Sequence, residues 1–184
     1  MDFNFGWYVL YVQPRWEKKV FKLLEDNNLE AFLPLVKTVR QWSDRKKILN
    51  VPLFPSYVFV SINSSLEFSR VMSLKGVNGF VRFGKEYALI PQKEIERIKV
   101  LIGLKGITDI QVKNPNLKIG ETMKITSGPL GGLECEVLKN GGKNRIIVKI
   151  DSIKQNIIAT LPYFYLEHKK ASPLLSKKDA GKIK

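Results

Sequence analysis

The pattern of apolar residues changes near residue 103, and this change limits what a chain of 184 residues can fold into. Before it, runs typical of strands alternate with segments of helical spacing; after it, only short β-rich runs occur. The intervening segment 103–116 holds two glycines, a proline and two asparagines without a sustained period, which indicates a linker. We therefore expect domains at 1–102 and 117–168, followed by a basic tail at 169–184 that lacks periodicity and is expected to be disordered.

The first domain is expected to combine a sheet with three helices. Its opening run, WYVLYV at 7–12, is aromatic and β-branched, as in a buried strand. The predicted order is β-α-β-β-β-α-β-α, which favours an α+β sandwich of ferredoxin-like type with the helices on one face of the sheet. The predicted strands are 7–12, 32–42, 47–53, 57–62 and 77–83, and the predicted helices are 16–27, 66–74 and the segment from Pro91 to Ile102.

The second domain is expected to be a small β-barrel. Asn140-Gly141-Gly142 is a strong hairpin signal, because Asn and Gly adopt positive φ at little cost. Several short strands separated by turn residues within about fifty residues are typical of a barrel. The predicted strands are 121–126, 133–138, 145–150 and 157–161.

Composition indicates the class of partner and excludes several chemistries. The chain has 31 Lys and Arg against 17 Asp and Glu, a net charge of +14, which favours a polyanion such as nucleic acid, although any single lysine can equally be solvated surface. Cys135 is the only cysteine and His168 the only histidine, so we expect no disulfide, metal site, cofactor or catalytic centre. The N-terminus lacks a signal sequence and no apolar run approaches the ~18 residues of a membrane span, so a cytoplasmic protein without membrane contact is expected.

A basic hairpin is the main candidate for nucleic-acid contact. The sequence SDRK at 43–46 contains Ser and Asp, which are typical of turns, and it lies between two segments that are expected to be extended. Basic side chains neutralise phosphates and an aromatic ring can stack on an unpaired base. The alternative is a solvated tip with the tryptophan packed on the sheet. The candidate residues are Lys37, Arg40, Trp42, Arg45, Lys46 and Lys47.

Three segments carry a family resemblance. PLFPSYVFV at 52–60 and RFGKEYALIPQKEIERI at 82–98 resemble the N-terminal domain of the NusG family of transcription factors. IGETMKITSGPLGGLECEV at 119–137 is similar to a KOW motif, the signature of an SH3-like barrel, although Cys135 stands where that motif usually has glycine. Its glycine-rich stretch lacks the Gly-Lys-Ser/Thr ending of a phosphate-binding loop and is better explained as a tight turn, formed by Gly128, Pro129, Leu130 and Gly132.

The resemblance implies a function in transcription elongation and antitermination. It implies docking to the clamp helices of the largest subunit of RNA polymerase, and contact of the basic hairpin with the nontemplate DNA strand. It also implies that the barrel, around Ile153, meets a small-subunit ribosomal protein or the termination factor Rho. We expect a monomer. The polymerase-docking residues implied are Tyr8, Phe54, Pro55 and Tyr57, for which ordinary core packing is the alternative.

The stretch RQWSDRKKILNVPLFPSYVFV is similar to specialised relatives, in particular the UpxY antiterminators of capsular polysaccharide operons. Two other functions stay open: a ribosome- or RNA-binding KOW protein, and an acylphosphatase-like enzyme on a ferredoxin-like sheet. The β-branched runs favour a permanent barrel over the helical C-terminal domain with which one relative, RfaH, masks its docking patch.

Overall fold

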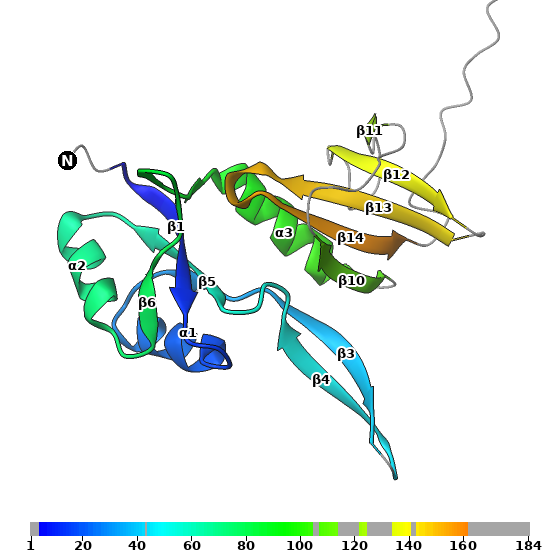
Figure 1. Cartoon of the computed structure of the whole chain (residues 1–184), viewed down its shortest axis with the longest axis horizontal. Coiled ribbons are helices and arrows are strands. Elements are labelled where there is room, and N and C mark those ends of the chain that lie inside the picture. Colours follow the sequence, from blue (N-terminus) through cyan, green and yellow to red (C-terminus); the bar gives the residue numbers. More distant parts are fainter. Residues whose placement is uncertain are drawn as a thin grey trace, which may run out of the picture.

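The computed structural model describes residues 4–42, 44–104, 107–113, 122–124, 134–140 and 143–161 (Figure 1). The fold is mixed α/β, with one main sheet in the N-terminal part of the chain and a second in the C-terminal part. The glycines and proline of the predicted KOW turn, 128–132, and the basic tail, 169–184, lie outside the described residues.

The N-terminal sheet is antiparallel, with β1 (Gly6–Val12) at its centre. Strand β1 pairs with β5 (Tyr57–Ile62) on one side and with β6 (Val77–Phe80) and β9 (Leu89–Ile90) on the other. The short strand β2 (Ala31–Phe32) continues the sheet beyond β5. Because successive side chains of β1 point to opposite faces and nearly all are apolar, both faces of this sheet need a cover.

Helices cover both faces. Helices α1 (Glu17–Asp26) and α2 (Ser65–Ser73) pack over the face that carries Leu10 and Val12. Helix α3 (Gln92–Gly103) packs over the face that carries Trp7 and Val9, through the predicted isoleucines and through Leu101. The expectation that all helices share one face is therefore wrong, because the apolar residues on the second face recruit α3.

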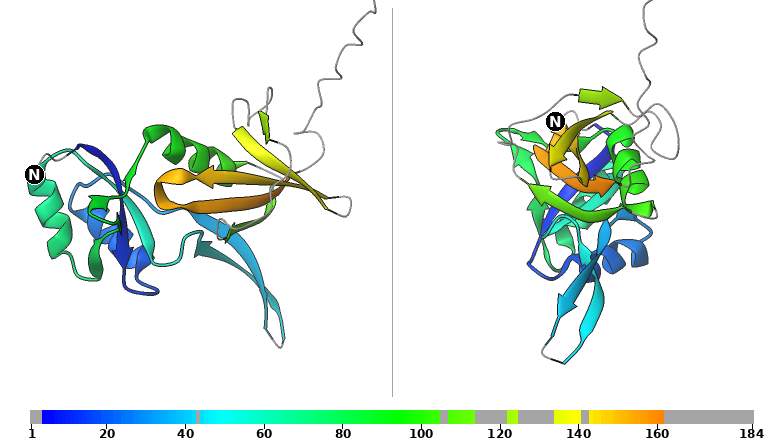
Figure 2. Two further views of the ribbon diagram at one scale, coloured as in Figure 1. Left: turned by 45° about the horizontal axis from the view of Figure 1, so that its top comes forward. Right: turned by 90° about the vertical axis from the view of Figure 1, so that its right-hand side faces the viewer.

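The basic hairpin consists of β3 (Leu35–Gln41) and β4 (Lys46–Pro52). The two strands pair only with each other, in continuous register from Leu35 opposite Pro52 to Gln41 opposite Lys46. The hairpin projects away from both sheets (Figures 1 and 2). A smaller ribbon, β7 (Arg82–Phe83) and β8 (Glu86–Tyr87), follows β6.

The C-terminal sheet has five antiparallel strands in the order β10-β14-β13-β12-β11. Strand β10 (Thr108–Lys113) lies within the segment expected to be a linker and pairs with β14. The other four correspond to the four predicted runs: β11 (Thr122–Lys124), β12 (Glu134–Asn140), β13 (Lys143–Ile150) and β14 (Gln155–Leu161). A 3-10 turn, η1 (Asp151–Ile153), joins the last two.

The C-terminal sheet packs against the N-terminal part. Strands β13 and β14 run beside α3 in Figures 1 and 2. Their buried residues, including Ile150 and Ile153, belong to the same hydrophobic cluster as Ile95 and Ile98 of α3. The two sheets therefore share one apolar core across α3.

Candidate functional site

The Phe54-Pro55-Ser56-Tyr57 segment forms a tight turn that leads into β5. The Tyr57 amide donates to the Phe54 carbonyl at 3.2 Å, and Ser56 has a left-handed φ of 63°. This combination, with proline in the second position, is typical of a type II turn. The Val12 amide donates to the Ser56 carbonyl at 2.8 Å, which ties the turn to the end of β1.

Glu17 fixes the same turn from the other side. Its Oε1 accepts the Ser56 amide at 2.8 Å, and its side chain is buried at the first residue of α1. Hydrogen bonds from amides to carboxylates are stronger than neutral ones, so this contact holds the turn firmly against α1. Sequence reasoning missed Glu17, because a charged residue at a helix start is normally solvent-exposed.

Pro55 and Tyr57 keep surface exposure. Pro55 is exposed and Tyr57 is half-buried. Tyr57 lies opposite Tyr11 in the β1–β5 ladder, and the two rings meet edge to face with centroids 6.3 Å apart. Tyr11 is 46% exposed and was not a candidate in the sequence analysis. These three residues form what we call the tyrosine edge.

Tyr8 does not join this surface. It is 3% exposed and points to the opposite face of the sheet, where its ring meets those of Phe68, Phe80 and Tyr87 edge to face. Its hydroxyl donates to the Asn4 carbonyl, and burial, with a smaller contribution from Tyr87, raises the pKa of Tyr8 above its usual value. Tyr8 is therefore core in this structure, as the alternative interpretation holds.

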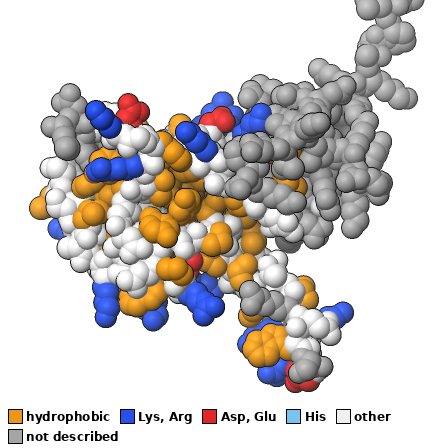
Figure 3. Space-filling model, in the orientation of Figure 1, with side chains coloured by type: hydrophobic (Ala, Val, Ile, Leu, Met, Phe, Trp, Pro, Cys, Tyr) orange, Lys and Arg blue, Asp and Glu red, His pale blue; other side chains and the backbone are white. Residues whose placement is uncertain are grey.

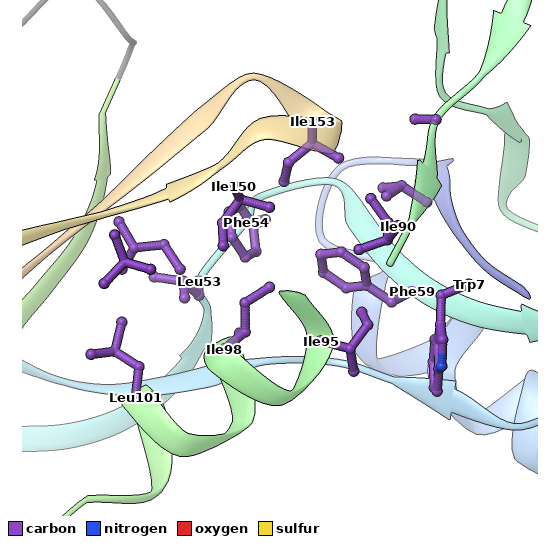
Figure 4. Packing of buried hydrophobic residues seen from close by; sticks show 14 of the residues in the cluster. Trp7, Leu53, Phe54, Phe59, Ile90, Ile95, Ile98, Leu101, Ile150 and Ile153 are labelled. Atoms are coloured by element: carbon purple, nitrogen blue, oxygen red, sulfur yellow. The ribbon is translucent and has the colours of Figure 1, made fainter. Parts of the chain in front are cut away.

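Phe54 is covered by the C-terminal sheet. It is 2% exposed, and its ring meets that of Phe59 at 5.6 Å. Figure 4 shows Phe54 beside Ile150, with Ile98 of α3 below, and all three belong to one buried cluster.

Ile153, the predicted partner-binding residue of the C-terminal domain, is also 2% exposed and belongs to the same cluster. Two polar contacts flank it. Ser152 Oγ donates to Glu94 Oε2 of α3, and Lys154 Nζ lies 4.7 Å from the ring centre of Phe83. The predicted docking residues Phe54 and Ile153 are thus buried together in the interface between the two parts of the chain.

The basic hairpin is open to solvent. Trp42 is 57% exposed, and Lys37, Arg45, Lys46 and Lys47 are all exposed. The backbone of Arg40 lies opposite Lys47 in the ladder. Trp42 sits beyond the last residue of β3, where its amide donates to the Arg45 carbonyl at 2.8 Å. Its indole is therefore not packed on the sheet, and the hairpin presents an aromatic ring among cations.

One face of the hairpin also carries exposed aliphatic side chains. Val39 and Ile48 lie directly opposite each other and are both largely exposed. An ion pair at 4.0 Å joins Asp44 to Arg45, and both side chains are solvent-exposed, so it contributes little stability. Orange and blue side chains lie close together on this hairpin at the lower right of Figure 3.

Two other kinds of feature are absent from the part of the chain that the structure describes. No three His, Cys, Asp or Glu side chains there gather into a group that could hold a metal ion. None of the helices described is both long and apolar enough to cross a lipid bilayer.

Comparisons with known proteins agree on one family. The family model described as transcription termination factor NusG matches residues 5–99. The transcription termination/antitermination proteins NusG of Chlamydia trachomatis and Chlamydia muridarum are each 28% identical over 159 residues, spanning 79% of this chain and 86% of the relative. A solved structure titled "Domain interaction in Thermotoga maritima NusG" covers 86% of this chain and 94% of its own, with 23% identity and a TM-score of 0.50.

Proposed function

Because this chain belongs to the NusG family of transcription termination and antitermination factors, we propose that it binds RNA polymerase, contacts the nontemplate DNA strand and suppresses pausing and termination. The observation that carries the proposal is the hydrogen-bonded Phe54–Tyr57 turn, with aromatic rings on both sides, within the residues that match the family. It acts without catalysis, by binding one state of the polymerase in preference to another.

The proposed polymerase-docking surface consists of the tyrosine edge (Tyr11, Pro55 and Tyr57) with Phe54 behind it. Aromatic residues dominate the binding energy of many interfaces because they bury large areas at low entropic cost. The proposed partner is the pair of clamp helices of the largest polymerase subunit. Tyr8 is left out of this proposal because it packs inside the N-terminal core.

Docking through Phe54 requires the C-terminal sheet to move. In the described arrangement, Phe54 and Ile153 share one buried cluster, so neither is available to another protein. We propose that the chain exchanges between this closed arrangement and an open one, and that polymerase binds the open one. The C-terminal partner, either a small-subunit ribosomal protein or Rho, then binds around the released Ile153.

The proposed DNA-binding element is the β3–β4 hairpin. An unpaired nontemplate strand offers phosphates to Arg45, Lys46 and Lys47 and bases to the exposed Trp42. Within the family, we propose that this chain belongs with the UpxY-type antiterminators of capsular polysaccharide operons. We also propose that its N-terminal domain is ferredoxin-like and that its C-terminal domain is a KOW barrel. These proposals are supported by the sequence similarities at 40–60 and 119–137.

An elongation assay with purified polymerase tests the function. The full chain is expected to shorten pauses and raise readthrough on the leader template of its own operon. Unchanged pausing and readthrough would contradict the proposal.

The variant Tyr11→Ser tests the docking surface in the same assay. We expect it to weaken polymerase binding by roughly tenfold, since an exposed aromatic anchor contributes at least about 1.4 kcal/mol at a hot spot. Leu66→Ser is the matched control, because Leu66 is a large exposed apolar residue on α2, away from this edge. Equal effects of the two substitutions would show that the tyrosine edge has no special role.

A further inference from the structure

The two faces of the β3–β4 hairpin differ in their exposure to solvent. Side chains alternate along each strand and the two strands are in continuous register. Val39 and Ile48 therefore lie on one face, and the neighbouring residues Thr38 and Leu49 lie on the other. Val39 is 62% exposed and Ile48 is 65% exposed, whereas Thr38 and Leu49 are half-buried. We call the face that carries Val39 and Ile48 the aliphatic face.

The opposite face of the hairpin turns toward the body of the molecule. At the base of β3, Val36 packs against the buried cluster that contains Phe54. Val36 and Thr38 are two residues apart and so share a face, which means that the aliphatic face points away from this core. The exposure of Val39 and Ile48 shows that no described segment of the chain covers the aliphatic face.

The stability of the hairpin explains only part of this pattern. β-branched residues favour strands, and a cross-strand pair of them contributes modestly to a hairpin. Threonine satisfies the same backbone preference with a hydroxyl group, as Thr38 does one position earlier on β3. Strand formation therefore does not require that Val39 and Ile48 both be aliphatic. Their apolar character is the feature that indicates a contact.

Two lysines flank the aliphatic pair. Lys37 lies two residues before Val39 on β3, and Lys46 lies two residues before Ile48 on β4, so both belong to the aliphatic face. Both are exposed, and neither forms an ion pair with a carboxylate of the described residues. A complementary surface therefore has an apolar centre with carboxylates around it. A second copy of this chain does not fit, because its aliphatic face would bring two further lysines to the contact.

The aliphatic pair is also a poor match for a single DNA strand. Such a strand is bound by cations at its phosphates and by aromatic rings at its bases, and Val39 and Ile48 offer neither. The proposed DNA contacts Trp42 and Arg45 lie at the tip of the hairpin, and Lys47 belongs to the opposite face. The hairpin therefore has room for DNA at its tip and for a protein along its aliphatic face.

We propose that the aliphatic face of the hairpin docks on a protein surface of the transcribing polymerase, one that presents aliphatic side chains bordered by carboxylates. This inference rests on the proposed function, since the tyrosine edge must first bring the chain to the polymerase. The aliphatic face lies on β3 and β4, outside the tyrosine edge, so the two contacts hold the chain at separate points. A hairpin held along one face presents Trp42 to the nontemplate strand in a fixed position.

Site-specific photocrosslinking in a stalled elongation complex tests this docking. A diazirine-bearing amino acid replaces Ile48 in one full-length variant and Trp42 in another. We expect position 48 to crosslink to polymerase protein and position 42 to crosslink to the nontemplate strand. A crosslink from position 48 to DNA, or to a second copy of the chain, would overturn the proposal. So would the absence of any crosslink from position 48 when position 42 reaches the strand.

Val39→Thr/Ile48→Thr separates docking from hairpin stability, because threonine keeps the β-branching and removes the apolar surface. We expect it to weaken binding to the elongation complex by roughly tenfold, as the loss of a buried apolar anchor does. Binding to a free single-stranded oligonucleotide of about 16 nucleotides should stay unchanged. Backbone chemical shifts of β3 and β4 check that the hairpin still forms.

The control for this pair is Val100→Thr, which makes the same kind of change at a partly exposed valine on α3. It should leave binding to the elongation complex unchanged. Equal effects of the control and the hairpin pair would overturn the proposal. An equal loss of binding to the elongation complex and to the free oligonucleotide would assign the aliphatic face to DNA and would also overturn it.

Tyr11→Ser, measured beside the hairpin pair, distinguishes failure of this inference from failure of the proposed function. Weaker binding of Tyr11→Ser alone would retain docking through the tyrosine edge and overturn the role of the aliphatic face. Weaker binding of both variants, with position 48 crosslinked to polymerase protein, supports two separate contacts. Failure of the unchanged chain to bind the elongation complex would overturn the proposed function and this inference together.

Discussion

Ser56, in the turn from Phe54 to Tyr57, has a backbone conformation that favours glycine. Its φ of 63° is in the left-handed region, where a Cβ atom costs about 1 kcal/mol. Two hydrogen bonds compensate for this cost, one from the Ser56 amide to Glu17 and one from Val12 to the Ser56 carbonyl. The turn is therefore imposed by its surroundings as much as by its own sequence.

Ser56→Gly is expected to raise the free energy of unfolding by up to about 1 kcal/mol, because glycine relieves the left-handed strain while keeping both backbone hydrogen bonds. Chemical denaturation measures this free energy for the variant and the unchanged chain. Ser69→Gly is the control of opposite sign: it lies within α2, where glycine is unfavourable and should lower the free energy of unfolding. Destabilisation by Ser56→Gly would contradict this account of the turn.

Glu17→Gln is expected to lower the free energy of unfolding by about 1 kcal/mol, because a neutral amide oxygen accepts the Ser56 amide less strongly than the carboxylate does. Glu25→Gln is the matched control, since Glu25 is an exposed carboxylate on the same helix. Thermal unfolding of both variants decides the question. Equal effects would mean that the Glu17 contact contributes nothing beyond ordinary surface charge.

The sequence does not show that Tyr8 is buried and Tyr11 is exposed. The run WYVLYV predicts a buried strand, and β1 is one. Because its residues are apolar on both faces, alternation does not identify which tyrosine meets solvent. That depends on how far α3 and the C-terminal sheet extend over the second face, and they leave Tyr11 partly exposed.

Among the elements, those with a strong local signal were predicted within a few residues. Helix α3 follows its isoleucine spacing, and the two hairpin strands lie on either side of the predicted turn residues, with Gln41 opposite Lys46. Strand β10 was missed because glycine and asparagine dominate the segment around it, while the ladder that makes it a strand is a contact with β14, far along the chain. Similarly, the Lys75 ammonium group lies over the ring of Trp16, which precedes α1, and no local pattern connects these two residues.

At the hairpin, Trp42→Ala separates binding from folding. The exposed indole contributes little to stability, so the free energy of unfolding should change by less than about 0.5 kcal/mol. Binding to the nontemplate strand should weaken by roughly tenfold, because one stacking contact is lost. Crosslinking to a stalled elongation complex measures the binding, and denaturation measures the folding. A large loss of stability with unchanged crosslinking would instead assign Trp42 a structural role.

For the whole molecule, the shared core buries two residues for which we propose docking roles, one from each part of the chain. The cluster joins Phe54 of the N-terminal part to Ile150 and Ile153 of the C-terminal part. If polymerase binds only the open arrangement, its apparent affinity is reduced by the fraction of molecules that are open. Weakening the interface should then strengthen polymerase binding, which is the opposite of what a loss of ordinary stability predicts.

Ser152→Ala is a small change that should weaken the interface between the two parts of the chain. Removing the hydroxyl leaves the buried Glu94 carboxylate without the Ser152 donor in the closed arrangement only, at a cost of about 1.5 kcal/mol. The open fraction and the affinity for polymerase should therefore rise roughly tenfold. Asp151→Asn, in the same turn but exposed, should leave both unchanged. Hydrogen exchange at Phe54, which the C-terminal sheet covers, reports the opening independently. Faster exchange with unchanged polymerase affinity would mean that the interface opens but does not control docking, so polymerase would have to bind through the tyrosine edge alone.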